Sequence, residues 1–193
     1  MSEEADSRSR DFINLHRAHQ FLARKVRMYE RIHPLFLKPQ NLEENLEIVM
    51  DVLVQDMDVE AGSIILIDPS AREFFFAAAR GPVADEIKKI RFPADKGIAG
   101  AAVRGQQTLA VSDVNRDPRF YREMTDQLGF KVRSLLAVPI VYHGDSIGVI
   151  ELINKREGND FHHPEVEAVE RVAGLVANLI ALGEHLIETR RGA

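Results

Sequence analysis

The sequence predicts an α+β fold: a central, mostly antiparallel sheet of about six strands with helices on one side, and long N- and C-terminal helices that form a dimer bundle. Two pairs of β-branched and apolar runs flank short turns, which is typical of β-hairpins. Apolar residues recur at helical spacing in three other segments, two of them near the ends of the chain. With 193 residues, 45% of them hydrophobic, the chain can bury one good core.

Composition argues against several classes of protein. The net charge of −5 does not suggest a general nucleic-acid binder, and no run of eighteen apolar residues predicts a membrane span. The chain has no cysteine, which excludes disulfides, thiolate metal sites, a cysteine nucleophile and a thioether-linked chromophore. The first residues, MSEEADSRSR, lack the apolar region of a secretion signal. We therefore expect a cytoplasmic protein with neither nucleic acid nor membrane as a partner.

The N-terminal part divides into a polar segment, 1–9, expected to be disordered, and a helix over 10–38 for signalling and dimerisation. Residues at alternating steps of three and four predict a coiled-coil seam: Phe12, Leu15, His19, Leu22, Val26, Tyr29 and His33. The helix is basic, and its charges either contact an anionic polymer or membrane surface or form a solvated outer face. The second interpretation is favoured, with the seam paired to another helix.

A second helix is predicted from Asn41, which can cap it, to Met57. Strands follow at Ser63–Asp68 and Phe74–Ala79, joined by a turn at Pro69-Ser70. Val83–Lys89 is a weak helix or a loop, and Ile90–Phe92 a short strand.

The stretch 93–103 combines a strand end, a glycine turn and a helix of small residues. Such a unit either forms an anion site at the helix N-terminus or is a tight turn that lets helix and sheet pack closely. A short strand is expected at Thr108–Val111. The long connection Ser112–Phe130, with one helical turn at most, is typical of a lid or binding loop.

The second hairpin joins Leu135–Tyr142 to Ile147–Ile153 through a turn at 143–146. Pro139 is unusual inside a strand because it lacks a backbone donor. Glu151 places a carboxylate on an otherwise apolar face. It is either part of a wet strand end or an internal ion pair, or an acceptor that lines a pocket.

The last helix is expected over 164–190, with Pro164 in its first turn. Its apolar face is wide enough for two partners, the sheet and another helix. The two seams are Val166, Val169, Ala173, Val176, Ile180, Gly183 and Ile187, and Val172, Leu175, Leu179, Leu182 and Leu186. The adjacent His162 and His163 diverge in a turn, so no metal site is expected, and no catalytic constellation stands out.

This order of elements resembles a GAF domain over residues 41–187. RFPADKGIAG at 91–100 is similar to the RIPADQGIAG-like stretch of regulatory GAF domains in cyclic-nucleotide phosphodiesterases and bacterial cyclases. Asn154, Lys155, Phe161 and Glu165 resemble the family's NK…Fx₃DE signature, with Glu165 in place of the usual Asp and Val166 in place of the usual Glu. The resemblance implies a structural role for these residues, with Lys155 and Glu165 as an ion pair.

The resemblance also implies a ligand pocket. The family's pocket positions fall on Ser63, Ile98, Ala99, Tyr121 and Glu151, and an acidic position of the loop falls on Thr125. The residue pair that reads a purine becomes Ala79-Arg80, and two threonines become Leu128 and Val132. These substitutions remove a stacking face and several polar contacts, worth ~1–3 kcal/mol each, which argues against binding of cyclic GMP. Arg80, if it faces the pocket, favours an anionic ligand.

Two functions follow from this resemblance. The first is a non-catalytic sensor that binds a cyclic nucleotide or another small anionic metabolite between sheet and loop. It relays binding through a homodimer of terminal helices to an output domain or a protein on another chain, as part of a regulator such as a bacterial kinase, cyclase or transcription activator. The alternative is a ligand-free dimerisation or interaction module. Some GAF proteins reduce free methionine sulfoxide, but that chemistry uses cysteine, so an enzyme is not expected.

Overall fold

The computed structural model describes residues 15, 19, 21–37 and 41–191, the side chains of 184–191 excepted. The predicted disorder of residues 1–9, and Phe12 of the predicted seam, lie outside the described residues. In the described part, six strands form one antiparallel sheet in the order β3-β2-β1-β6-β5-β4. The strands are β1 Val59–Asp68, β2 Glu73–Arg80, β3 Arg91–Pro93, β4 Leu109–Val111, β5 Leu135–Tyr142 and β6 Asp145–Lys155. The predicted α+β class and antiparallel sheet are confirmed.

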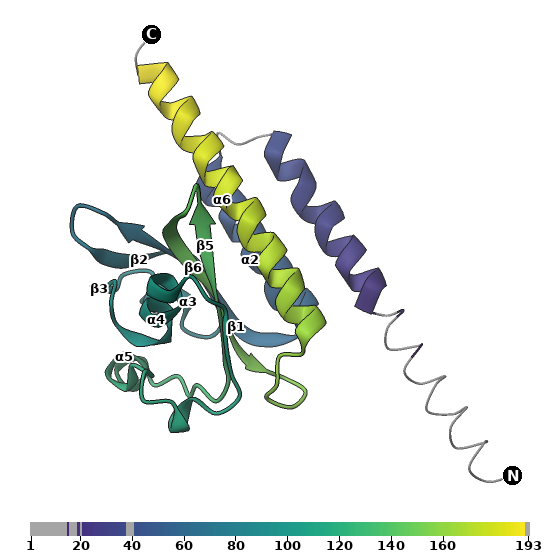
Figure 1. Cartoon of the computed structure of the whole chain (residues 1–193), viewed down its shortest axis with the longest axis vertical. Coiled ribbons are helices and arrows are strands. Elements are labelled where there is room, and N and C mark those ends of the chain that lie inside the picture. The colour runs from purple at the N-terminus through teal and green to yellow at the C-terminus, as the bar shows by residue number, and fades with distance from the viewer. Residues whose placement is uncertain (1–14, 16–18, 20, 38–40, 192–193) are drawn as a thin grey trace, which may run out of the picture.

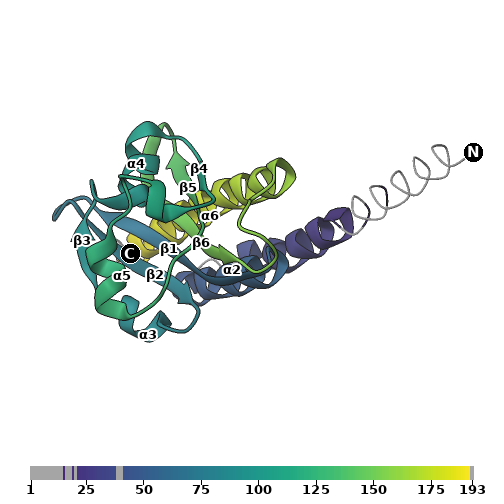
Figure 2. The same cartoon turned by 90° about the horizontal axis from the view of Figure 1, so that it is seen from below.

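Helices cover both faces of the sheet, so the prediction of helices on one side was wrong. One face carries α2 (Leu42–Asp56) and α6 (His163–Arg191), and the other carries α4 (Gly97–Gly105) (Figures 1 and 2). The remaining short helices are η1 (His33–Leu37), α3 (Ala84–Ile87), η2 (Val114–Arg116) and α5 (Arg122–Leu128). None of the helices in the described part of the chain is long and apolar enough to cross a membrane.

The two covered faces follow from the strand sequences, in which both alternating sets of side chains are apolar. Leu136 and Ile150 belong to the core beneath α2 and α6. Ala137 and Val149, their sequence neighbours, belong to a second core on the α4 side. Successive side chains point to opposite faces of a strand, so a strand that is apolar throughout needs cover on both sides.

Pro139 lies in β5 without disrupting the sheet. It pairs with Val149 of β6, whereas β4 pairs with β5 only over Leu135–Ala137. Pro139 therefore lies where β5 has a single neighbouring strand, and a missing donor costs little there.

The side chain of Asn41 does not cap α2, contrary to the prediction. It makes no capping hydrogen bond, and its amide donates instead to the carboxylate of Glu44 at 3.0 Å. The helix still begins where expected because its apolar stripe, including Leu46, Met50 and Leu53, is buried against the sheet.

The N-terminal helix, described as helical over residues 21–32, packs beside α6 (Figure 1). Met28 and Ile32 are fully buried in the core beneath the helices. Three members of the predicted seam face outward, since Leu15, Leu22 and Val26 are 70%, 59% and 56% exposed. Tyr29, a later member, is partly buried against the core. Most described members of the two α6 seams are buried within the chain.

Two buried polar residues at the end of β6 connect both layers. The side chain of Asn154 accepts a hydrogen bond from the Arg133 backbone N–H at 2.7 Å and donates to the carbonyl of Lys131 at 2.8 Å. The ammonium of Lys155 donates to the carbonyl of Met57 and to the carboxylate of Glu165, both at 2.6 Å. Asn154 thus fixes the loop before β5, while Lys155 fixes the end of α2 and the start of α6.

Replacing Asn154 is expected to destabilise the fold strongly. Asn154→Ala leaves buried backbone groups without partners, at about 1–3 kcal/mol, and places alanine at a left-handed φ of 59°, at about 1–2 kcal/mol more. Asn154→Gly loses the hydrogen bonds but not the conformational freedom, so its loss is about 1 kcal/mol smaller. Urea unfolding measures both variants.

The control is Asn159→Ala, at an exposed position in the following loop, which should leave stability unchanged within about 0.5 kcal/mol. An Asn154→Ala variant as stable as this control would contradict the structural role of Asn154.

Candidate ligand-binding site

A cavity of about 50 Å³ lies between the second face of the sheet, the N-terminus of α4 and the lid, defined here as residues 120–132 with α5 at its centre. The floor is formed by side chains of β5 and β6. The lining residues are Val83, Ile87, Phe92, Lys96, Gly97, Ile98, Ala99, Phe120, Tyr121, Met124, Thr125, Leu128, Phe130, Val132, Leu135, Glu151 and Ile153.

Five of the seven binding residues predicted from the sequence line this cavity: Ile98, Ala99, Tyr121, Thr125 and Glu151. They come from α4, the lid and β6, which are far apart in the chain. Tyr121 lies beside Gly97, whose φ of 74° is a backbone conformation that favours glycine. The Thr125 hydroxyl donates to the carbonyl of Arg122 at 2.9 Å.

Ser63 is buried directly opposite Glu151 in the pairing of β1 with β6, but it does not line the cavity. Arg80 lies on the other face of the sheet, so its predicted place in the pocket was wrong. Its guanidinium binds the α2 carboxylates of Asp51 and Glu47. The alternation along β2 explains the difference, because Ala78 and Arg80 share the face that α2 covers.

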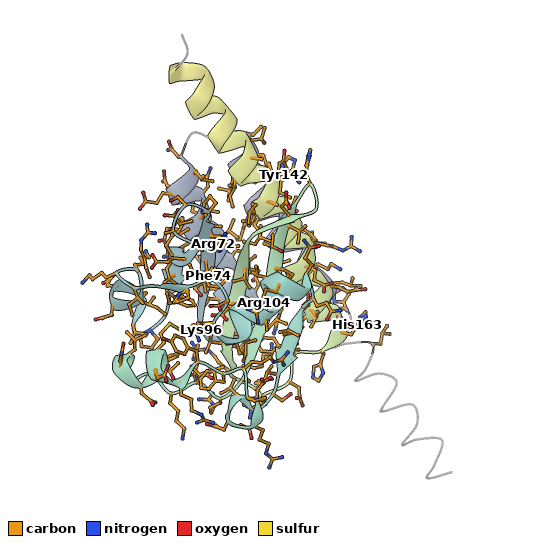
Figure 3. All side chains as sticks on the ribbon, turned by 60° about the vertical axis from the view of Figure 1, so that its left-hand side comes forward. Arg72, Phe74, Lys96, Arg104, Tyr142 and His163 are labelled. Carbon is orange, nitrogen blue, oxygen red and sulfur yellow. The ribbon has the colours of Figure 1, made fainter. Side chains whose placement is uncertain are left out.

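Several lining residues were not among those predicted. They are Lys96, which precedes α4, and the apolar side chains of Phe92, Phe120, Met124 and Phe130. Lys96, labelled in Figure 3, had one sequence signal, which was its position just before the glycine that starts α4. The signal for Met124 was weaker, since only one helical turn was expected in the segment that forms α5.

Glu151 is the notable residue of the site. It is only 7% exposed, and no described residue donates a hydrogen bond to its carboxylate or forms an ion pair with it. Because burial disfavours the charged form, the pKa of Glu151 is raised to about 7. The predicted alternative of an internal ion pair is therefore wrong. The carboxyl group faces a cavity, where a donor from a ligand could reach it.

The N-terminus of α4 supplies the opposite polarity. The first backbone N–H groups of a helix have no partners within it and carry partial positive charge. Lys96 at the N-cap gives α4 no side-chain cap, and its first turn holds no acidic residue. The described residues include no group of three or more His, Asp or Glu placed to hold a metal ion. The arrangement suits reversible binding of a small polar molecule.

Sequence comparison assigns the family: the profile of the GAF domain matches residues 41–180, and the chain belongs to the GAF domain family. A relative is the mouse "cone cGMP-specific 3',5'-cyclic phosphodiesterase subunit alpha'", 32% identical over 108 residues, or 54% of this chain. The aligned region makes up 12% of that protein, so the chain spans only a small part of its length.

Solved structures share the fold. The GAF domain of a phosphoenolpyruvate-protein phosphotransferase from Coxiella burnetii superposes with a TM-score of 0.76 and 20% identity, covering 84% of this chain and 96% of that one. The free methionine-R-sulfoxide reductase of Neisseria meningitidis, in complex with its substrate, superposes with a TM-score of 0.68 and 21% identity. The match covers 80% of this chain and 87% of that one. Identities this low establish the fold alone.

The buried carboxyl of Glu151 predicts a pH-dependent stability. Its folded pKa of about 7 exceeds the ordinary value of 4.5, so the folded state holds the proton more tightly than the unfolded state. Stability from this group is therefore complete below about pH 4.5 and falls as the pH rises to about 7, by up to about 3 kcal/mol. Glu151→Gln removes this dependence.

Urea unfolding of both proteins at pH 5 and pH 8 measures the effect. Relative to the wild type, the free energy of unfolding of Glu151→Gln should rise by about 2 kcal/mol from pH 5 to pH 8. Glu157→Gln, at an exposed position, is the control and should follow the wild type. Parallel pH profiles for wild type and Glu151→Gln would rule out the raised pKa.

Proposed function

We propose that this GAF domain is a non-catalytic sensor that binds a small molecule in the cavity beneath the lid and relays binding to the terminal helices. The observation that carries the proposal is Glu151, a buried carboxyl without a described partner that faces a cavity. Unpaired buried carboxyl groups destabilise a fold, so one that faces a cavity between sheet and lid is a marker of binding.

The ligand requires movement of the lid. Ligand pockets usually measure about 300–1,000 Å³, and the cavity of about 50 Å³ is far smaller. A cyclic nucleotide, the ligand class suggested by the phosphodiesterase relative, therefore fits only after α5 and its flanking loops move outward. The placement of Arg80 on the other face also removes the cation that favoured an anionic ligand.

The route of the relay is short. Asn154 holds Lys131, at the end of the lid, and Arg133, just after it, and Lys155 holds α2 and α6. A lid displaced by a ligand would therefore pull on the strand end that anchors both helices. We expect these helices to act on an output domain or another chain, as part of a larger regulator in the cytoplasm.

The chain lacks the cysteine that we expect a methionine sulfoxide reductase of this fold to need. The likeness to the Neisseria enzyme is therefore a likeness of fold and is not evidence for a shared reaction.

The second candidate function is a ligand-free interaction module. The small volume and largely apolar lining of the cavity favour it, since a cavity this size can be closed by slight repacking. The same experiment separates the two functions.

Thermal-shift measurements with cyclic nucleotides, 2-oxo acids and amino acids test the sensor. At least one compound should raise the melting temperature of the wild type, because a ligand that binds only the folded state stabilises it. Leu128→Trp, which fills the cavity from α5, should abolish the shift. Gln127→Trp, exposed on the same helix, should preserve it. No shift with any compound would favour the interaction module.

Dimerisation is the second part of the proposal. The exposed stripe Leu15, Leu22 and Val26 has coiled-coil spacing and is left without a partner by the described residues of the chain. We expect light scattering to give twice the chain mass of 21.8 kDa. Leu22→Lys with Val26→Lys should yield a monomer, while Arg24→Gln, at an exposed position on the opposite side of the helix from both, should not. A monomeric wild type at tens of micromolar would contradict the dimer.

A further inference from the structure

The charges that line the cavity define two poles. Among its seventeen lining residues, only Lys96 and Glu151 carry charged side chains. Lys96 is exposed at the rim, on the strand-to-helix turn before α4, whereas Glu151 is buried on the central strand β6. The site therefore has a carboxylate at its floor and a cation at its mouth.

The floor selects a hydrogen-bond donor. An ionised carboxylate only accepts hydrogen bonds, and burial without a donor or cation is unfavourable. No described residue supplies either to Glu151. A ligand with an ammonium group would supply both the charge and the donors at once, and would gain a charge-assisted hydrogen bond in a site with little water.

The mouth selects an anion. Lys96, Gly97, Ile98 and Ala99 all line the cavity, so the N-terminus of the nine-residue helix α4 opens onto it. This terminus has neither a side-chain cap nor an acidic residue in its first turn. No described residue forms an ion pair with Lys96. Free backbone N–H groups and an adjacent ammonium suit a carboxylate.

Apart from Tyr121 and Thr125, the rest of the cavity lining is apolar. Phe92, Phe120, Phe130, Met124 and Leu128 offer no hydrogen bonds, and the hydroxyl of Thr125 already donates to a backbone carbonyl. Such a wall does not suit a ribose, or a second carboxylate deep in the cavity, because polar groups buried without partners cost free energy. It suits an aliphatic or thioether side chain.

From this juxtaposition we propose that the ligand is a small apolar α-amino acid, with its ammonium group at Glu151 and its carboxylate at Lys96 and the N-terminus of α4. This inference rests on the proposed sensor function and names the class of molecule that it senses. No bond is made or broken; the lid moves to admit the ligand, whose two charged groups neutralise both poles.

Calorimetry with matched compounds tests the assignment. The probes are L-leucine and L-methionine, compared with 4-methylpentanoate, which lacks the ammonium group, and 3-methylbutylamine, which lacks the carboxylate. At least one amino acid should bind at least tenfold more tightly than either analogue, because each analogue leaves one pole unpaired.

Variants at Glu151 and Lys96 test which group of the ligand binds at each residue. Glu151→Gln should weaken amino-acid binding at least tenfold and leave 4-methylpentanoate unchanged. Lys96→Met should weaken the amino acid and 4-methylpentanoate together, and leave the amine unchanged. Lys89→Met, at an exposed lysine that does not line the cavity, is the matched control and should bind as the wild type does. Circular dichroism of each variant checks that it is folded.

Two results would overturn the inference. Equal or tighter binding of 4-methylpentanoate would show that no cation is required at Glu151, while the sensor function would stand. Absence of binding by both amino acids, with a thermal shift from a cyclic nucleotide or 2-oxo acid, would reject the amino acid and again keep the sensor. The sensor function is contradicted only if none of the compounds binds in calorimetry or raises the melting temperature.

Discussion

The pair Asn154-Lys155 at the end of β6 is the constraint on which both layers depend. Asn154 adopts a left-handed backbone conformation, with φ of 59°, and its fully buried side chain binds the loop that carries the lid into β5. Lys155 binds the C-terminal end of α2 and the N-terminal end of α6. Hydrogen bonds of buried polar groups are costly to break, so the pair ties lid and helices into one unit.

A charged side chain on one face of the sheet is paired within the chain, and one on the other face is not. On the helix side, Arg80 meets Asp51 and Glu47, so its charge is paired within the chain. On the lid side, Glu151 has no described partner and faces a cavity instead. A paired charge specifies how α2 lies on the sheet, whereas an unpaired one stores unfavourable free energy that a ligand can relieve. Ligand binding and movement of the lid are thus coupled.

Alternation and periodicity predicted much of the fold, but not what depends on long-range packing. The two hairpins, the glycine turn at α4 and the last helix follow from local patterns. The helix that covers the second face of the sheet, α4, was not predicted there, although the apolar residues Ala137 and Val149 already indicated a covered face. The facing of Arg80 was missed because an irregular register between β1 and β2 cannot be read from an ungapped sequence. Glu151 was found because a carboxylate broke an apolar face. The signal for Lys96 was weaker, since it was only its position just before the glycine that starts α4.

The ionisation of Glu151 tests the central claim most directly. Carbon-13 NMR of its side-chain carboxyl carbon, assigned by comparison with Glu151→Gln, measures the pKa without unfolding the protein. The account predicts a pKa of about 7 in the free protein, because the group is buried without a partner, and a pKa below the ordinary 4.5 once an amino acid places its ammonium group there. A pKa near 4.5 in both states would contradict the account, since Glu151 would then be solvated or paired within the chain.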